Sequence, residues 1–172
     1  KTRINFFKQL SAYKPVDSGG KVLNNLGYCV SKLDKKTDFL SQYKFSIAFE
    51  NESYPGYTTE KIIFPLLAYS IPIYWGNPLI DKDFNSKAFI NCHDYDNFDE
   101  VIEHIKEVDN DDILYKRYLS EPIFVDNIIS QSADEQAIFN RFEQIFTQPV
   151  CYKDPVKKSI FTTLTQSLKD RF

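Results

Sequence analysis

An acidic and a basic residue stand side by side where an apolar helix is predicted to begin. Glu60 and Lys61 open residues 60–70, a mostly apolar helical stretch in which Pro65 predicts a kink. The free N–H groups and positive dipole end of a helix attract an anion, and Lys61 adds a point charge for phosphate oxygens. Glu60 can accept hydrogen bonds from two ribose hydroxyls, as acidic residues do in dinucleotide folds. Such a pair is also common as plain helix-end solvation, so the surrounding sequence has to decide.

Other polar patterns give weaker indications of a metal site. Asp94-Tyr95-Asp96 has a spacing that can hold a divalent cation between carboxylates and a diphosphate. Because Asp96 precedes Asn97 and a helical pattern, we interpret it as a helix N-cap instead. His93 and His104 are too few for a metal cluster. We therefore expect no metal.

The elements that must position these residues alternate between strand and helix. Apolar and small residues alternate over 45–49, and similar short runs over 71–75 and 88–92 predict two more strands. A strand, a helix and a strand within about 30 residues form a βαβ unit, whose loops and helix N-termini meet at the carboxyl edge of the sheet. The predicted fold class is α/β, with a Rossmann-like open parallel sheet. Helices are predicted over residues 3–13, 37–43, 60–70, 97–108, 112–119 and 134–147.

The bulk composition limits the classes of partner. The chain has 172 residues and a net charge of −3, and such a charge argues against binding to a nucleic-acid backbone. Three widely spaced cysteines fit a reducing cytoplasm better than a disulfide framework. No apolar run reaches the roughly 18–20 residues of a membrane-spanning helix. Because the sequence contains no Met, we expect it to be part of a longer protein.

The most specific pattern lies in residues 45–76, FSIAFENESYPGYTTEKIIFPLLAYSIPIYWG. The succession of FEN, a short loop, YTTEK and a strand with a small-residue turn resembles the α-1,3/4-fucosyltransferase family, and its bacterial members most closely. Further likeness occurs in VDSGGKVLNN, FLSQYKF, YWGNP, KDFN and HDYDNFDE, so the resemblance covers roughly residues 3–120.

This resemblance implies the fold and the reaction. The family has a two-domain GT-B architecture, of which residues 1–150 would be the C-terminal, GDP-fucose-binding domain. An inverting α-1,3-fucosyltransferase transfers fucose from GDP-fucose, its donor substrate, to an N-acetylglucosamine hydroxyl of a lactosamine-type glycan, and no cofactor is expected. Protein glycosylation and lipopolysaccharide synthesis are the expected settings. The general base and acceptor site would lie in a missing N-terminal domain, so we expect this chain alone to be inactive.

The resemblance also assigns site residues. Lys61 and Arg3 match the family's diphosphate-binding cations and are the candidates for a catalytic role, since they would stabilise charge on the leaving group. Glu60 matches the ribose-binding acid. Asn51 and Tyr57 would line the fucose and phosphates, and Thr58 belongs to the same substrate-binding motif.

Alternatives remain open at this point. The chain could be a GT-B transferase that uses another nucleotide sugar, or a non-catalytic module that binds a nucleotide sugar. Residues 151–172 are predicted to form an amphipathic helix, with an apolar stripe from Val156 to Phe172 flanked by lysines and Arg171. This helix could dock on the missing domain, which we favour, or make a peripheral contact with the inner membrane of a cytoplasmic protein.

Overall fold

The computed structural model describes residues 1–30, 33–129 and 134–147. The chain divides into two compact units, Lys1–Ser130 and Gln131–Phe172, which are described separately. The amphipathic helix predicted for residues 151–172 lies outside the described residues, so this helix and the boundary at residue 150 stay predictions.

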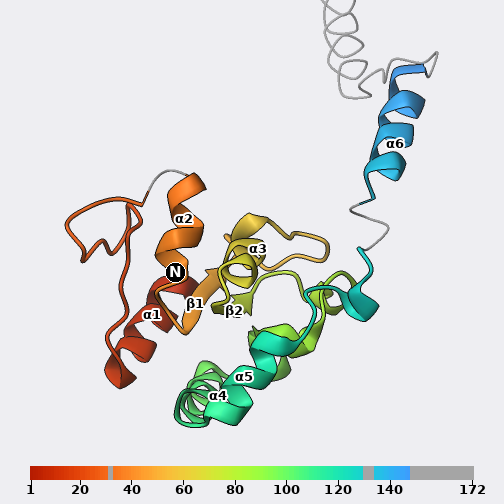
Figure 1. The fold of residues 1–172 in the computed structure, drawn as a ribbon. Coiled ribbons are helices and arrows are strands. Elements are labelled where there is room, and N and C mark those ends of the chain that lie inside the picture. Colours follow the sequence, from red (N-terminus) through yellow and green to blue (C-terminus); the bar gives the residue numbers. More distant parts are fainter. Residues whose placement is uncertain (31–32, 130–133, 148–172) are drawn as a thin grey trace, which may run out of the picture. The chain divides into compact units, whose positions relative to one another are not determined.

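The first unit is built on a three-stranded parallel sheet (Figure 1). Strands β1 (Phe45–Phe49) and β2 (Ile71–Trp75) pair in register along their whole length, and β3 (Ile90–Asn91) follows on the other side of β2. The predicted α/β class with an open parallel sheet is therefore confirmed. Strand β3 is shorter than predicted because 3₁₀ turns, Ser86–Ala88 and Cys92–Asp94, occupy its two ends.

One face of the sheet packs against helices α1 (Thr2–Tyr13) and α4 (Phe98–Asn110). Phe6 of α1 and Val101 of α4 are fully buried in one cluster with Ile73 of β2. Burial of one such side chain contributes about 1.5–3 kcal/mol relative to leaving it exposed. Helix α5 (Asp112–Ser120) adds half-buried aromatic side chains to the same cluster. This packing fixes α1 against the sheet.

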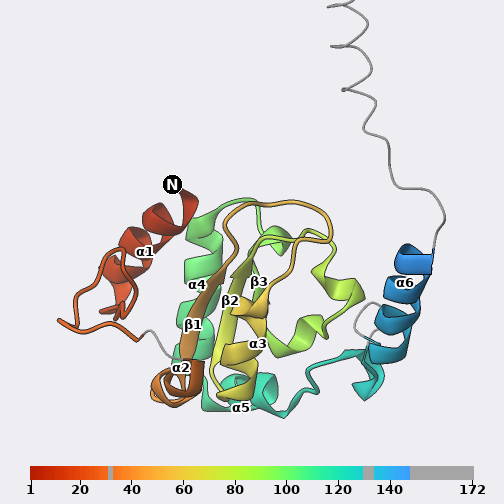
Figure 2. The same cartoon turned by 90° about the horizontal axis from the view of Figure 1, so that it is seen from above.

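The other face is covered by helix α3 (Glu60–Leu67), on the opposite side of the sheet from α4 (Figure 2). Ile62 of α3 is fully buried in a second cluster with Ala48 of β1 and Tyr74 of β2. Helix α2 (Leu33–Leu40) lies beside α3, with the Lys36 Nζ atom 5.0 Å from the centre of the Phe64 ring.

Several predicted boundaries and faces needed correction. The spacing of Ile4, Phe7 and Leu10 predicts one apolar stripe on α1, but Ile4 is 36% exposed, because the face that meets the sheet is centred on Phe6 and Leu10. Helix α2 was predicted over 37–43 but ends at Leu40, where the chain turns towards β1. Helix α3 ends at Leu67, before the predicted end at residue 70, because Tyr69 adopts a positive φ of 54°.

The predicted N-cap of α4 was also wrong. The cap is Asn97, whose side chain accepts hydrogen bonds from the backbone N–H groups of Asp99 and Glu100. Glu100 in turn accepts from the backbone N–H of Asp96 at 3.2 Å, which completes a reciprocal capping arrangement. Asp96 therefore precedes the cap instead of forming it.

The second unit contains helix α6 (Glu135–Thr147), as predicted for residues 134–147. Phe142 and Phe146 stack along one side of this helix, with ring centres 6.3 Å apart. None of the described helices combines the length and apolar composition that a membrane crossing requires.

A buried carboxylate ties α1 to the rest of the first unit. Asp109, near the end of α4, accepts hydrogen bonds from the Tyr13 hydroxyl at 2.9 Å and the Lys14 ammonium at 2.7 Å, and Lys44 lies 3.6 Å away. Burial alone raises the pKa of Asp109, but the hydrogen bonds from Lys14 and Tyr13 and the charges of Lys14 and Lys44 outweigh it and lower that pKa. Asp109 therefore anchors the C-terminal end of α1.

Asp109→Asn is expected to reduce the free energy of unfolding by about 1–3 kcal/mol at neutral pH, because the buried acceptor loses its charge. The folded-state pKa of Asp109 lies below the unfolded value, so its contribution is present above the unfolded pKa and is lost as pH falls through the folded pKa. The stability difference between wild type and variant should shrink between about pH 5 and pH 2. Urea unfolding followed by Trp75 fluorescence measures it, with exposed Asp81→Asn as control. A difference that stays constant over this range would contradict the assignment.

Candidate active site

The site residues gather at the carboxyl ends of β1 and β2. Glu50 directly follows β1, and Gly76 and Asn77 directly follow β2. Because parallel strands place their following loops at one edge, these residues lie beside the start of α3. The backbone N–H of Glu50 donates to the carbonyl of Trp75 at 2.8 Å, which extends the pairing of the two strands by one residue.

The Glu50 carboxylate is the most deeply buried charge at this edge. The residue is 2% exposed. It accepts hydrogen bonds from the Thr59 backbone N–H at 2.8 Å, from the Thr59 hydroxyl at 2.8–3.0 Å and from the Lys61 ammonium at 3.2 Å. The Lys61 ammonium also donates to the Thr59 hydroxyl at 2.9 Å. The three side chains form one closed network at the first turn of α3.

Gly76 leaves the space that the Glu50 side chain occupies. A Cβ atom at position 76 would lie 2.4 Å from Glu50 Cγ and 2.7 Å from Glu50 Cβ, far inside van der Waals contact. A side chain on residue 76 would therefore displace Glu50 from the network. The small residue after β2 is required by this close approach.

Asn77 holds the loop that leads into α3. The residue is 1% exposed, and its side-chain oxygen accepts from the backbone N–H groups of Gly56 and Leu79, both at 2.9 Å. Its side-chain nitrogen donates to the Thr58 hydroxyl at 3.0 Å. Hydrogen bonds therefore hold the loop before α3 to the end of β2 and the start of α3 to the end of β1.

Arg3 reaches the same edge from α1. Its guanidinium donates to the carbonyl of Phe49, the last residue of β1, and to the side-chain oxygen of Asn51 at 3.2 Å. Both bonds come from one terminal nitrogen, so the other guanidinium nitrogens keep their donors for further partners. The N-terminal end of α1 thus brings a permanent cation to the FEN segment.

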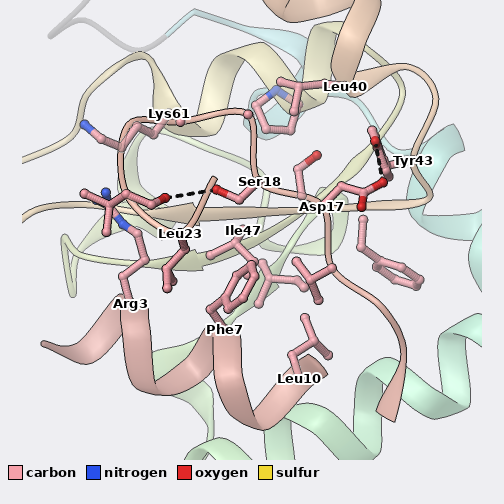
Figure 3. Close-up of a pocket in the computed structure, with 18 of the residues that line it drawn as sticks. Arg3, Phe7, Leu10, Asp17, Ser18, Leu23, Leu40, Tyr43, Ile47 and Lys61 are labelled. Carbon is pink, nitrogen blue, oxygen red and sulfur yellow. Dashed lines mark hydrogen bonds between the residues drawn. The ribbon is translucent and has the colours of Figure 1, made fainter. Parts of the chain in front are cut away.

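These elements enclose a cavity of about 1120 Å³. Figure 3 shows Arg3 and Lys61 towards one end and the Asp17–Tyr43 pair towards the other. The Tyr43 hydroxyl donates to Asp17 at 2.8 Å, and burial together with this bond raises the pKa of Tyr43 to about 12, so the phenol stays neutral. The cavity lining is partly apolar and includes Phe7, Leu10, Leu23, Leu40, Ile47 and Phe64.

The structure brings together part of the predicted site. Arg3, Asn51 and Lys61 all line the cavity. Glu60 is exposed in the first turn of α3, outside the cavity lining.

Tyr57 and Thr58 also lie outside the lining. Both residues are half-buried in the loop before α3. The Thr58 hydroxyl is the acceptor for Asn77, and the Tyr57 backbone N–H donates to the carbonyl of Tyr54 at 3.1 Å. Their roles towards a ligand stay predictions.

Sequence reasoning missed Glu50 and Asn77. The FEN pattern contains Glu50 but indicates no role for it, and Gly76-Asn77-Pro78 indicates only the end of a strand. Their position in the sequence was the available signal, since both are polar residues within two positions of the end of a buried parallel strand, where ligands and helix N-termini meet. Within the described part of the chain, His, Cys, Asp and Glu side chains form no group of three or more suited to a metal ion.

Comparison with known proteins decides the family. The model for "Glycosyltransferase family 10 (fucosyltransferase) C-term" matches residues 1–143. The chain belongs to glycosyltransferase family 10. The matched region includes Glu50, Asn77 and every predicted site residue, so the network described above belongs to this family 10 domain.

Relatives and solved structures agree with this assignment. An α-(1,3)-fucosyltransferase of Helicobacter pylori is 52% identical over 104 residues, which are 60% of this chain and 21% of the relative. GDP-fucose protein O-fucosyltransferase 3 of Homo sapiens is 32% identical over 125 residues, 68% of this chain and 26% of the relative. A crystal structure of an α1,3-fucosyltransferase with GDP-fucose superposes with a TM-score of 0.80 at 41% identity, covering 89% of this chain and 46% of that one. The chain therefore spans less than half the length of each of these proteins.

Gly76→Ala is expected to lower the free energy of unfolding by about 1–3 kcal/mol, because the added methyl group overlaps the Glu50 side chain. Urea denaturation measures the change. Gly20→Ala is the matched control, since a Cβ atom there would have its nearest neighbour at 3.9 Å. If both variants have wild-type stability, the close approach at residue 76 is not a constraint.

Proposed function

We propose that this family 10 domain binds GDP-fucose and presents it for inverting transfer of fucose to an N-acetylglucosamine hydroxyl of a lactosamine-type glycan, as part of an α-1,3-fucosyltransferase. The observation that carries the proposal is the convergence of Arg3 and Lys61, from helices far apart in the sequence, at one end of a large cavity. A diphosphate is the part of the donor that such a pair suits best.

The charge of the cavity supports an anionic ligand. Seven basic and four acidic residues line it. Of the acidic residues, Glu50 and Asp109 are already engaged by Lys61 and by Lys14, while Arg3 is held by uncharged oxygens. A guanidinium held by uncharged oxygens keeps its charge and further N–H donors for phosphate oxygens.

The relatives support GDP-fucose as the donor. One is named for α-(1,3)-fucosyl transfer and another for O-fucosylation of proteins with GDP-fucose, and each matches more than half of the chain. Both names state fucosyl transfer, and a common donor site would explain why both proteins resemble this chain. The superposed crystal structure contains GDP-fucose.

The proposed roles follow from position. Arg3 and Lys61 would stabilise charge that develops on the leaving diphosphate, where one preorganised donor contributes on the order of 3–4 kcal/mol to the transition state. Asn51, held by Arg3, would face the fucose and phosphates together with Tyr57, and Glu60 would accept from the ribose hydroxyls. We assign the general base to a part of the enzyme outside this chain and expect no cofactor.

Donor identity separates the main proposal from its alternatives. Calorimetry with GDP-fucose, GDP-mannose and UDP-galactose in parallel should show tightest binding for GDP-fucose. Preference for another of the three would indicate a transferase with a different nucleotide sugar. A cytoplasmic setting, with residues 156–172 docked on protein in preference to membrane, belongs to the same proposal.

Lys61→Ala and Glu60→Ala should each weaken GDP-fucose binding, by about tenfold for a lost charged hydrogen bond. Glu60 is exposed, so its variant should keep wild-type stability, whereas Lys61→Ala also leaves Glu50 with fewer partners and should be less stable. Binding is measured by calorimetry at a temperature where circular dichroism shows each variant folded. Lys8→Ala, an exposed residue of α1 outside the cavity, is the control. Wild-type affinity in both test variants would remove these residues from the site.

The isolated chain should bind GDP or GDP-fucose without transferring fucose. Transfer also requires an acceptor held in line with the fucose C1 atom and a base near its hydroxyl, which we assign to the opposite wall of the enzyme. Incubation with labelled GDP-fucose and N-acetyllactosamine tests this expectation. A fucosylated product at rates typical of a complete transferase would place the base within these residues.

A further inference from the structure

We propose that Glu50 is a positioning residue of the donor site, which holds the Lys61 ammonium and the first turn of α3 in the geometry that binds the diphosphate. The inference rests on the function proposed above and adds to it a role for a residue that acts through Lys61. It starts from the fact that a nearly fully buried carboxylate accepts hydrogen bonds from Thr59 and Lys61 at the start of one helix.

Fold stability alone gives little reason for a charge at this position. Removing a carboxylate from water is expensive, and replacing a buried ion pair with apolar residues is often neutral or stabilising. The structure nevertheless accommodates Glu50 by leaving residue 76 without a side chain and by using the Thr59 backbone N–H, the Thr59 hydroxyl and Lys61 as donors. Such an arrangement is better explained by what it does to Lys61 than by the net stability of the pair.

The network limits the freedom of the Lys61 ammonium. A lysine side chain carries three N–H donors on a flexible stem. Two of the donors are taken by Glu50 at 3.2 Å and by the Thr59 hydroxyl at 2.9 Å, which leaves one for a ligand. The Lys61 side chain is 26% exposed and lines the cavity that Arg3 also lines. The Lys61 side chain has therefore already lost conformational entropy in the unliganded domain, and this entropy no longer opposes the binding of a ligand.

The charge of Glu50 and its contacts with Lys61 have opposite effects on the affinity for a diphosphate, and this makes the proposed role testable. As an anion, Glu50 repels a diphosphate and partly neutralises Lys61, so simple electrostatics predicts that removal of its charge tightens binding. As a positioning residue, Glu50 fixes Lys61 and Thr59, so its removal weakens binding. The sign of the change distinguishes the two effects.

The first experiment measures the dissociation constant of GDP by calorimetry for the 172-residue chain and for Glu50→Gln. The amide keeps the size of the side chain, and when its oxygen accepts from the Thr59 N–H its NH2 group, a donor, faces the Lys61 ammonium. We expect binding about tenfold weaker. Glu52→Gln is the matched control, because Glu52 is exposed, lines the same cavity and has the same charge; it should bind GDP as tightly as wild type or tighter. Unchanged or tighter binding by Glu50→Gln overturns the proposal.

A double-mutant cycle separates positioning from general damage to the fold. In a Lys61→Met background, where no ammonium is left to position, Glu50→Gln should change the affinity for GDP by about twofold or less, against about tenfold in wild type. An equal loss in both backgrounds would show that Glu50 does not act through Lys61, and would overturn the proposal.

A second variant decides the matter if Glu50→Gln does not fold. Thr59→Val keeps the shape of the side chain and removes only the hydroxyl that joins Glu50 to Lys61. We expect GDP binding several-fold weaker, and unchanged affinity would overturn the proposal. Wild-type chain that binds neither GDP nor GDP-fucose would instead overturn the proposed function and this role with it, whereas wild-type binding with no effect of Glu50 would overturn the positioning role alone.

Discussion

The arrangement of the carboxyl edge of the sheet depends on the hydrogen bonds that the buried Glu50 carboxylate accepts from Thr59 and Lys61. The Glu50 side chain lies against Gly76 at the carboxyl ends of β1 and β2 and accepts hydrogen bonds from the start of α3. A buried charge tolerates few arrangements, because each lost partner leaves it uncompensated. Hydrogen bonds at the first turn of α3 therefore fix its position along the sheet, in addition to the burial of apolar residues such as Ile62.

The side of the cavity formed by α1 depends on a second carboxylate, that of Asp109. Asp109 anchors the C-terminal end of α1, and Phe6 packs its middle against the sheet. Because a helix is rigid over this length, Arg3 at its other end is brought to the carbonyl of Phe49. Two acidic residues thus place the two cations, Arg3 and Lys61, that we assign to the diphosphate.

The sequence by itself determined the class of fold and most of its elements. Short runs of apolar and small residues over 45–49 and 71–75 predicted the parallel strands, because a strand covered on both faces carries few polar side chains. The YTTEK pattern identified the start of α3 and, through Lys61, one wall of the cavity. Boundaries were less certain, since the ends of α2, α3 and β3 are set by turns whose local propensities are weak.

Only the tertiary structure decided which polar side chains meet. The sequence offered Glu60 and Lys61 as neighbours with separate roles, but the partner of Lys61 in the folded domain is Glu50, eleven residues away. Arg3 and Asn51 are 48 residues apart and are joined only because α1 packs on the sheet. Periodicity reports which face of an element is buried, whereas hydrogen-bond partners follow from how elements pack, and that information is distributed over the whole core.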